Sequence, residues 1–152
     1  MVSASVEPAP RTARVNAPPT RRLLPQAIGD RVRALDVGVP TEGNPDMGPI
    51  VTGTQRDRIV GYIAAGVKEG AALVVDGRTH PRAQGTGFFL GGTLFDRVTS
   101  TMSIYQDEIF GPVLCVVRVA NADEALALCD GHRYGNGVAI FTRNGHAARE
   151  FA

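Results

Sequence analysis

The sequence predicts an α/β fold with a mostly parallel sheet and flanking helices, and three observations carry that prediction. Residues 113–119 read Val-Leu-Cys-Val-Val-Arg-Val, a β-branched run typical of a strand buried on both faces of a parallel sheet. Stretches with helical spacing of apolar residues alternate with short apolar runs along the chain. The length of 152 residues, 43% of them hydrophobic, is enough for one domain with a hydrophobic core.

Composition excludes several classes of partner. Sixteen basic and fifteen acidic residues leave a formal net charge of +1, which argues against a nucleic acid or an anionic membrane surface. No apolar run approaches the roughly 18 residues of a membrane span. The two cysteines and three histidines show no metal-ligand spacing, so no metal site is expected. We expect a cytoplasmic protein, or one of the mitochondrial matrix if the host is eukaryotic.

Residues 1–22 differ from the rest of the chain. They show no hydrophobic period and contain several prolines, namely Pro8, Pro10, Pro18 and Pro19. Such a segment buries too little apolar surface to offset the entropy of ordering it, which predicts a disordered leader. An organelle transit peptide is the alternative, although prolines break the amphipathic helix that it needs. The globular part is predicted to cover residues 23–152.

Two helices are predicted in the first half of the globular part. The first follows from apolar residues at roughly helical spacing, which are Leu24, Ile28, Val32 and Leu35. A loop rich in Gly and Pro follows over residues 37–49. Thr52 or Thr54 can cap the second helix, whose apolar residues recur every four positions and which ends at Gly70.

Strands and helices alternate in the second half. Residues 73–75 and 88–98 are predicted to be extended, and the run at 113–119 is the clearest strand. A helix over 122–129 is predicted because Asn121 and Glu124 resemble a capping box. A short strand at 138–141 and a helix at 145–152 complete the prediction.

The cysteines are the candidate nucleophiles, but both favour a packing role. Cys115 lies in the middle of the clearest strand, where a thiol behaves as a small buried hydrophobe with a raised pKa. Cys129 lies in the helix predicted at 122–129, where packing is again favoured.

One loop offers a more specific site. Glu108 and Phe110 precede the clearest strand, next to a Gly-Pro turn. A carboxylate at a loop-to-strand junction can accept two hydrogen bonds from a vicinal diol such as ribose. An aromatic ring beside it can offer a flat apolar surface to a sugar or heterocycle. On spacing alone, a solvated acidic loop explains these residues equally well.

Several motifs in order resemble the aldehyde dehydrogenase superfamily. Residues 108–112, Glu-Ile-Phe-Gly-Pro, followed by Val-Leu, resemble its Glu-x-Phe-Gly-Pro signature. Further blocks that resemble the family lie at residues 46–52, 68–71, 134–137 and 139–142. The blocks at 87–96 and 102–105 look like the CoA-acylating methylmalonate-semialdehyde dehydrogenases. The resemblance covers residues 23–152.

The resemblance implies an NAD-dependent oxidoreductase that converts methylmalonate or malonate semialdehyde and CoA to an acyl-CoA. It implies that Glu108 hydrogen-bonds the nicotinamide ribose and that Phe110 packs against that ribose and the nicotinamide. Asn136 falls near the inner end of the family's substrate tunnel, and family members form homo-oligomers.

The resemblance places the nucleophilic cysteine upstream of the matched region, and neither Cys115 nor Cys129 matches its motif. We therefore expect a truncated chain that holds no catalytic residue and is inactive alone. The alternative is a non-catalytic fragment or remnant that packs on a full-length dehydrogenase subunit.

Overall fold

The computed structural model describes residues 2–6, 20–135 and 137–151. In chain order its elements are β1 (Val2–Val6), α1 (Thr20–Arg33), α2 (Gly53–Lys68), β2 (Ala72–Val75), η1 (Gly77–Thr79), η2 (Pro81–Gln84), β3 (Thr93–Val98), α3 (Ser103–Gln106), β4 (Val113–Val119), α4 (Ala122–Asp130) and α5 (Gly145–Phe151).

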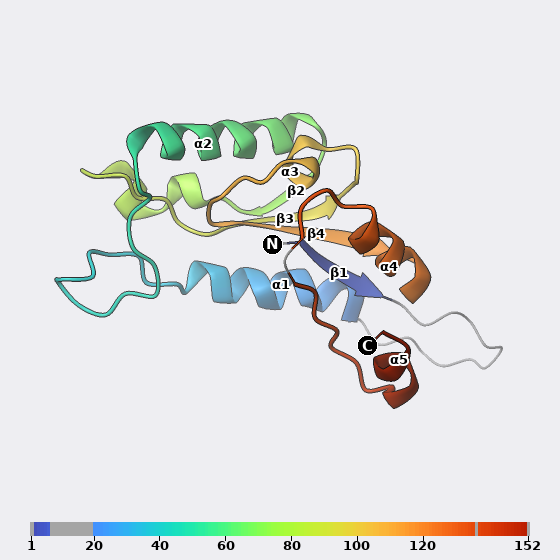
Figure 1. Ribbon diagram of the computed structural model, residues 1–152. Helices are drawn as coiled ribbons and strands as arrows, with labels where there is room; N and C mark the ends of the chain where they lie inside the picture. The colour runs from blue at the N-terminus through green and yellow to red at the C-terminus, as the bar shows by residue number, and fades with distance from the viewer. Residues whose placement is uncertain (1, 7–19, 136, 152) are drawn as a thin grey trace.

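Within the described residues the strands form one four-stranded sheet in the order β1-β4-β3-β2. Strand β4 runs parallel to both of its neighbours, and β2 pairs antiparallel with β3. Helices α2 and α3 lie over one face of this sheet, and α1 lies over the other (Figure 1). The predicted α/β class with flanking helices is confirmed, with the qualification that one edge of the sheet is antiparallel.

The best-predicted helices begin at side-chain caps. The Thr52 hydroxyl accepts the backbone N–H of Gln55 at 3.1 Å at the start of α2. The Asn121 side chain accepts the N–H of Glu124 at 2.8 Å at the start of α4. The Glu124 carboxylate accepts the N–H of Ala120 at 2.7 Å, one residue before the position that a standard capping box uses.

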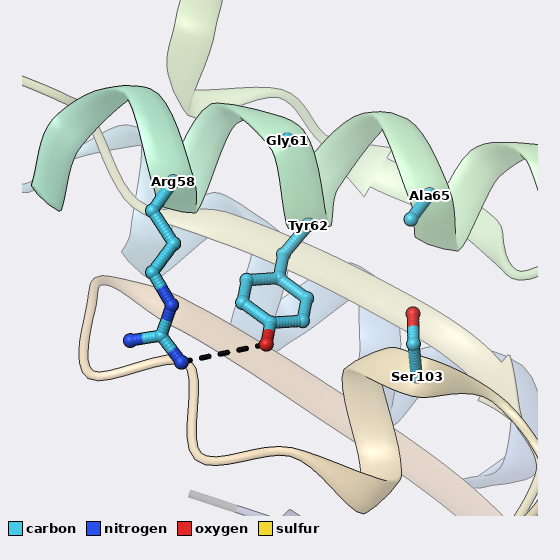
Figure 2. Close-up of a pocket in the computed structure, with 5 residues that line it drawn as sticks. All are labelled: Arg58, Gly61, Tyr62, Ala65 and Ser103. Carbon is cyan, nitrogen blue, oxygen red and sulfur yellow. Dashed lines mark hydrogen bonds between the residues drawn. The ribbon is translucent and has the colours of Figure 1, made fainter. Parts of the chain in front are cut away.

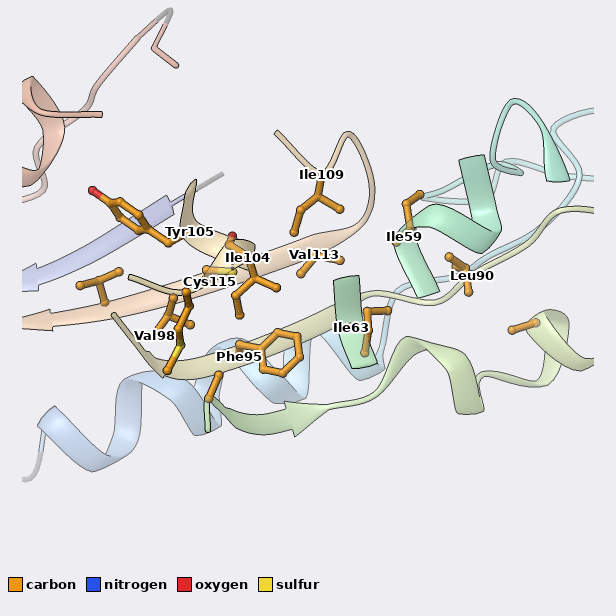
Figure 3. Close-up of a cluster of buried hydrophobic side chains, with 14 of the residues drawn as sticks. Ile59, Ile63, Leu90, Phe95, Val98, Ile104, Tyr105, Ile109, Val113 and Cys115 are labelled. Atoms are coloured by element: carbon orange, nitrogen blue, oxygen red, sulfur yellow. Dashed lines mark hydrogen bonds between the residues drawn. The ribbon is translucent and has the colours of Figure 1, made fainter. Parts of the chain in front are cut away.

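The core lies between the sheet and the helices α2 and α3 (Figure 3). Helix α2 contributes Ile59 and Ile63, which are fully buried because they recur on the face that meets the sheet. Strand β3 contributes Phe95, and β4 contributes every second residue, namely Val113, Cys115, Val117 and Val119. This packing fixes α2 next to the loop that leads from α3 into β4.

The predicted strand at 138–141 is wrong. The segment carries no strand pairing, and its side chains are exposed, with Phe141 at 97%. Both edges of β4 are already occupied, by β1 and by β3, so the segment has no place beside the clearest strand. An apolar run becomes a strand only where a neighbour completes its hydrogen bonds.

A strand and a short α-helix, besides the 3-10 helices η1 and η2, lie where the sequence predicted no element. Residues 2–6 form β1, which pairs with β4, although the sequence predicted no order anywhere in residues 1–22. Short polar-apolar alternation at the chain start carries too weak a pattern to predict an edge strand. The short helix α3 was missed because one turn gives no measurable helical period. The division of the chain at residue 22 stays a prediction, because residues 7–19 lie outside the described part.

Candidate ribose-binding loop

The loop that joins α3 to β4, residues 107–112, will be called the acidic loop. Helix α2 holds its backbone through side-chain donors. The Gln55 amide donates to the carbonyl oxygens of Ile109 at 3.0 Å and Phe110 at 3.2 Å. The Arg58 guanidinium donates to the carbonyl oxygen of Glu108 at 3.2 Å. Consecutive carbonyls of the acidic loop are therefore tied to one face of one helix.

The side chain of Asp107 adds a second anchor to the acidic loop. Its carboxylate accepts a hydrogen bond from the Tyr62 hydroxyl of α2 at 3.1 Å. It also forms an ion pair with Arg133, which follows α4. Arg133 donates in addition to the carbonyl oxygen of Gln106 at 3.1 Å. Three segments that are distant in sequence thus meet at the start of the acidic loop.

The two predicted ligand-binding side chains are exposed on this fixed backbone. Glu108 is exposed, and Phe110 is 76% exposed. The buried side chain of Ile109 separates them and anchors the loop to the core. An exposed carboxylate can accept hydrogen bonds from a diol, and an exposed ring offers an apolar surface to stack against. The structure brings the two residues together on one loop, and their role in cofactor binding stays a prediction.

The residues that hold the loop were not found from the sequence. Gln55 and Arg58 lie three positions apart, which places them on one face of α2, and this spacing was the available signal. Their partners are backbone carbonyls, which no sequence pattern reveals.

A shallow hollow of about 280 Å³ lies beside the acidic loop, between α2 and α3 (Figure 2). It is lined by Arg58, Gly61, Tyr62, Ala65 and Ser103. Arg58 donates to the Tyr62 hydroxyl at 3.4 Å and lies over its ring, so both side chains are already engaged in holding the loop.

The two cysteines have different environments. Cys115 is 2% exposed, and its thiol donates to the carbonyl oxygen of Ile104 at 3.5 Å. Burial raises the pKa of this thiol to about 11, so it is a protonated core residue, as predicted. The packing role predicted for Cys129 is wrong, because its side chain is exposed on α4. Leu128 and Ala125 form the inner face of that helix.

Two of the three histidines, His80 and His132, have capping and turn roles. The His80 ring accepts the N–H of Arg82 at 3.2 Å and so caps η2. The His132 ring lies between the carbonyl oxygens of Tyr105, at 2.7 Å, and Tyr134, at 2.9 Å. Residue Asn136, predicted to lie near a substrate tunnel, is outside the described residues.

Within the described ranges, no three His, Cys, Asp or Glu side chains gather as metal ligands would. The helices in that same part of the chain are all too short or too polar to cross a membrane.

Sequence comparison relates this chain to one enzyme family. The model of the aldehyde dehydrogenase family matches residues 21–152. The malonate-semialdehyde dehydrogenase of Pseudomonas aeruginosa is 54% identical over 131 residues, which are 86% of this chain and 25% of that protein. A malonate-semialdehyde dehydrogenase of Oceanobacillus iheyensis is 48% identical over 124 residues, 82% of this chain and 26% of the relative.

Solved structures agree with this relationship. The methylmalonate-semialdehyde dehydrogenase DddC of Oceanimonas doudoroffii superposes with a TM-score of 0.86 at 42% identity, covering 99% of this chain and 29% of that one. An aldehyde dehydrogenase of Mycobacterium tuberculosis complexed with NAD+ gives a TM-score of 0.71 at 38% identity, covering 76% and 24%. The chain spans about a quarter of the length of the curated relatives that it matches. Because the family model matches most of its residues, the chain belongs to the aldehyde dehydrogenase family.

Proposed function

We propose that this chain supplies the nicotinamide-ribose-binding loop of an NAD-dependent, CoA-acylating dehydrogenase for malonate or methylmalonate semialdehyde. The observation that carries the proposal is the acidic loop, which presents Glu108 and Phe110 to solvent from a backbone held at consecutive carbonyls. Exposed side chains on a fixed backbone are what a binding site requires, since little entropy is lost when the ligand arrives. The names of the relatives support the substrate class.

The residues of the loop fit the nicotinamide half of NAD. The Glu108 carboxylate would accept hydrogen bonds from the two ribose hydroxyls, and such charge-assisted bonds are stronger than neutral ones. The Phe110 ring would pack against the ribose and the nicotinamide and limit where the ring can lie. NAD, when bound, supplies the acceptor for the hydride of the substrate aldehyde.

The nucleophile of this reaction is proposed to come from outside the described residues. Cys115 is buried and its pKa is raised to about 11, so it supplies no thiolate at neutral pH. Cys129 is exposed on α4, and it does not match the nucleophile motif that the resemblance implies. We further propose a cytoplasmic location and a homo-oligomeric complete enzyme, in keeping with the bacterial relatives.

A chimera tests the proposal. The matching segment of the Pseudomonas aeruginosa relative is replaced by residues 21–152 of this chain, and NADH formation is followed with malonate semialdehyde and CoA. We expect turnover by the chimera and none by the 152-residue chain alone. A chimera that folds and assembles like the parent but shows no turnover would contradict the proposal and favour the non-catalytic alternative.

The role of Glu108 is tested in the active chimera. Glu108→Gln removes the charge of an exposed acceptor, so NAD-dependent turnover should fall by about ten- to a hundredfold, as expected for a lost hydrogen bond to a charged group. The melting temperature should stay unchanged because the side chain is exposed. Glu150→Gln, on the exposed side of α5, is the matched control. Equal turnover in the two variants would contradict a role of Glu108 in NAD binding and show that it is an ordinary solvent-exposed acid.

A further inference from the structure

Phe110 has a backbone conformation that a residue with a side chain rarely adopts. Its φ is +58°, in the left-handed region, where a phenylalanine is strained. Burial of the ring does not offset this strain, because the side chain is 76% exposed. A strained residue persists only where its surroundings determine its conformation, and such residues cluster at functional sites.

The residues on either side of Phe110 are held by packing against the core. The side chain of Ile109 is buried in the core. Gly111 packs so closely on Ile59 that a Cβ there would lie 2.5 Å from the Ile59 side chain. These contacts hold the chain before and after Phe110.

The Gln55 amide adds hydrogen bonds on both sides of the Phe110 backbone torsions. Its Nε2 donates to the carbonyl oxygens of Ile109 and Phe110, at 3.0 and 3.2 Å, and these carbonyls flank the φ and ψ bonds of Phe110. Bringing both oxygens to one donor restricts the rotation of the residue between them. Gln55 is itself held, since its backbone N–H donates to the Thr52 cap of α2 at 3.1 Å.

We propose that Gln55 is a positioning residue that holds Phe110 in the left-handed conformation and thereby aims its ring at the nicotinamide ribose. The first half of this statement concerns the chain alone, and the second half rests on the function proposed above. Gln55 acts here through the backbone of Phe110. Its loss should therefore change the conformation of Phe110 and the affinity for the nicotinamide half of NAD, and leave the global fold intact.

The test uses the full chain with two readouts. The first is the backbone of Phe110, followed by its ¹³Cα and carbonyl NMR shifts, which differ between left-handed and extended residues. The second is the affinity for nicotinamide mononucleotide, a probe that carries the nicotinamide, its ribose and one phosphate but lacks the adenosine half of NAD. Gln55→Ala removes the amide. Gln55→Glu keeps the size of the side chain but, as a carboxylate, cannot donate. Gln84→Ala is the matched control, because Gln84 also donates to a backbone carbonyl, that of Arg78.

We expect both Gln55 variants to shift the Phe110 resonances away from the left-handed values and to weaken binding of the probe by about five- to tenfold, the effect of one or two neutral hydrogen bonds. The Gln84→Ala variant should change neither readout. Melting temperatures of all variants are compared, and a Gln55 variant that loses probe affinity only in proportion to global unfolding contradicts the positioning role.

The two readouts separate this inference from the proposed function. If the wild-type chain binds the probe and the Gln55 variants keep the Phe110 shifts and the affinity of wild type, the positioning role is overturned and the proposed function stands. If the wild-type chain binds no probe while the Gln55 variants shift the Phe110 resonances, the backbone role stands and the aiming of the ring at ribose is overturned.

Discussion

Phe110 combines a strained backbone with an exposed ring. The backbone conformation lowers the stability of the fold, and the exposed ring adds little to it. The left-handed conformation costs about 1–2 kcal/mol for a residue with a Cβ, and glycine adopts it freely. Glycine also loses about 0.5–1 kcal/mol more conformational entropy on folding, so the net gain from Phe110→Gly is small. We expect this variant to raise the free energy of unfolding by about 0.5 kcal/mol while it weakens binding of nicotinamide mononucleotide.

Urea unfolding and a probe titration on the same samples check this prediction. Phe88→Gly is the comparison, because Phe88 is also partly exposed, at 46%, but is absent from the positive-φ residues of the described chain. Phe88→Gly should lower stability. A Phe110→Gly variant that loses as much stability as Phe88→Gly would show that the ring, and not the backbone, decides the energetics at this position.

At the level of secondary-structure elements, the ion pair between Asp96 and Arg118 links strand β3 to strand β4. The pairing of these strands shifts in register between Phe95 and Val98, and Arg97 at the irregularity has φ +57°. The Asp96 carboxylate accepts two hydrogen bonds from Arg118, at 2.9 and 2.7 Å, and one from the N–H of Arg97 at 2.8 Å. The hydrogen bonds from the Arg118 side chain are the largest cause that lowers the pKa of Asp96.

A lowered pKa in the folded state links this pair to pH. The ionised carboxylate stabilises the fold fully above the ordinary aspartate pKa of about 4, and the contribution is lost as pH falls through the lower folded value. Asp96→Asn should therefore cost about 1.5–3 kcal/mol at pH 7, and the difference from wild type should shrink below about pH 4. Urea unfolding at pH 7, 5 and 3 measures it. The control is Asp57→Asn, an exposed residue of α2, and an equal effect of both changes would contradict the assignment.

Sequence patterns predicted the elements whose signals are local. The cap at Thr52 and the β-branched run of β4 depend on neighbouring residues only, and both were confirmed. The strand predicted at 138–141 depended on a neighbour in the sheet, and β1 and β3 occupy both edges of β4. Cys129 was predicted to be buried because it lies in a helix. A helix also has a solvent-facing side, and the short apolar pattern of α4 does not decide which of its residues lie on that side.

The candidate site also divides into residues that local sequence patterns predict and residues that only the folded chain brings together. Glu108 and Phe110 lie in a contiguous motif, so the sequence could predict them as a pair. The residues that hold them come from other elements, about fifty positions away for Gln55 and twenty-six for the Arg133–Asp107 bond. Such contacts depend on how α2 packs on the sheet, which only the assembled fold determines.

The segment after α4 leaves an apolar surface that should drive self-association of the isolated chain. Its exposed apolar residues are Tyr134 at 44%, Val138 at 59%, Ile140 at 39% and Phe141 at 97%. Several large apolar side chains exposed within one short segment offer apolar surface to a second chain, and large apolar patches are unusual on soluble monomers. We expect light scattering coupled to size exclusion to show a mass that rises with protein concentration.

The triple change Val138→Thr, Ile140→Thr and Phe141→Ser should return the chain towards a monomer, because it removes apolar area without touching the core. The cooperative melt should remain, since these side chains contribute little to folding where they are exposed. The control variant Val51→Thr alters a residue that is 90% exposed and lies two positions before α2, and it should leave the association unchanged. A wild-type chain that stays monomeric at all concentrations would show that these side chains tolerate water without a partner.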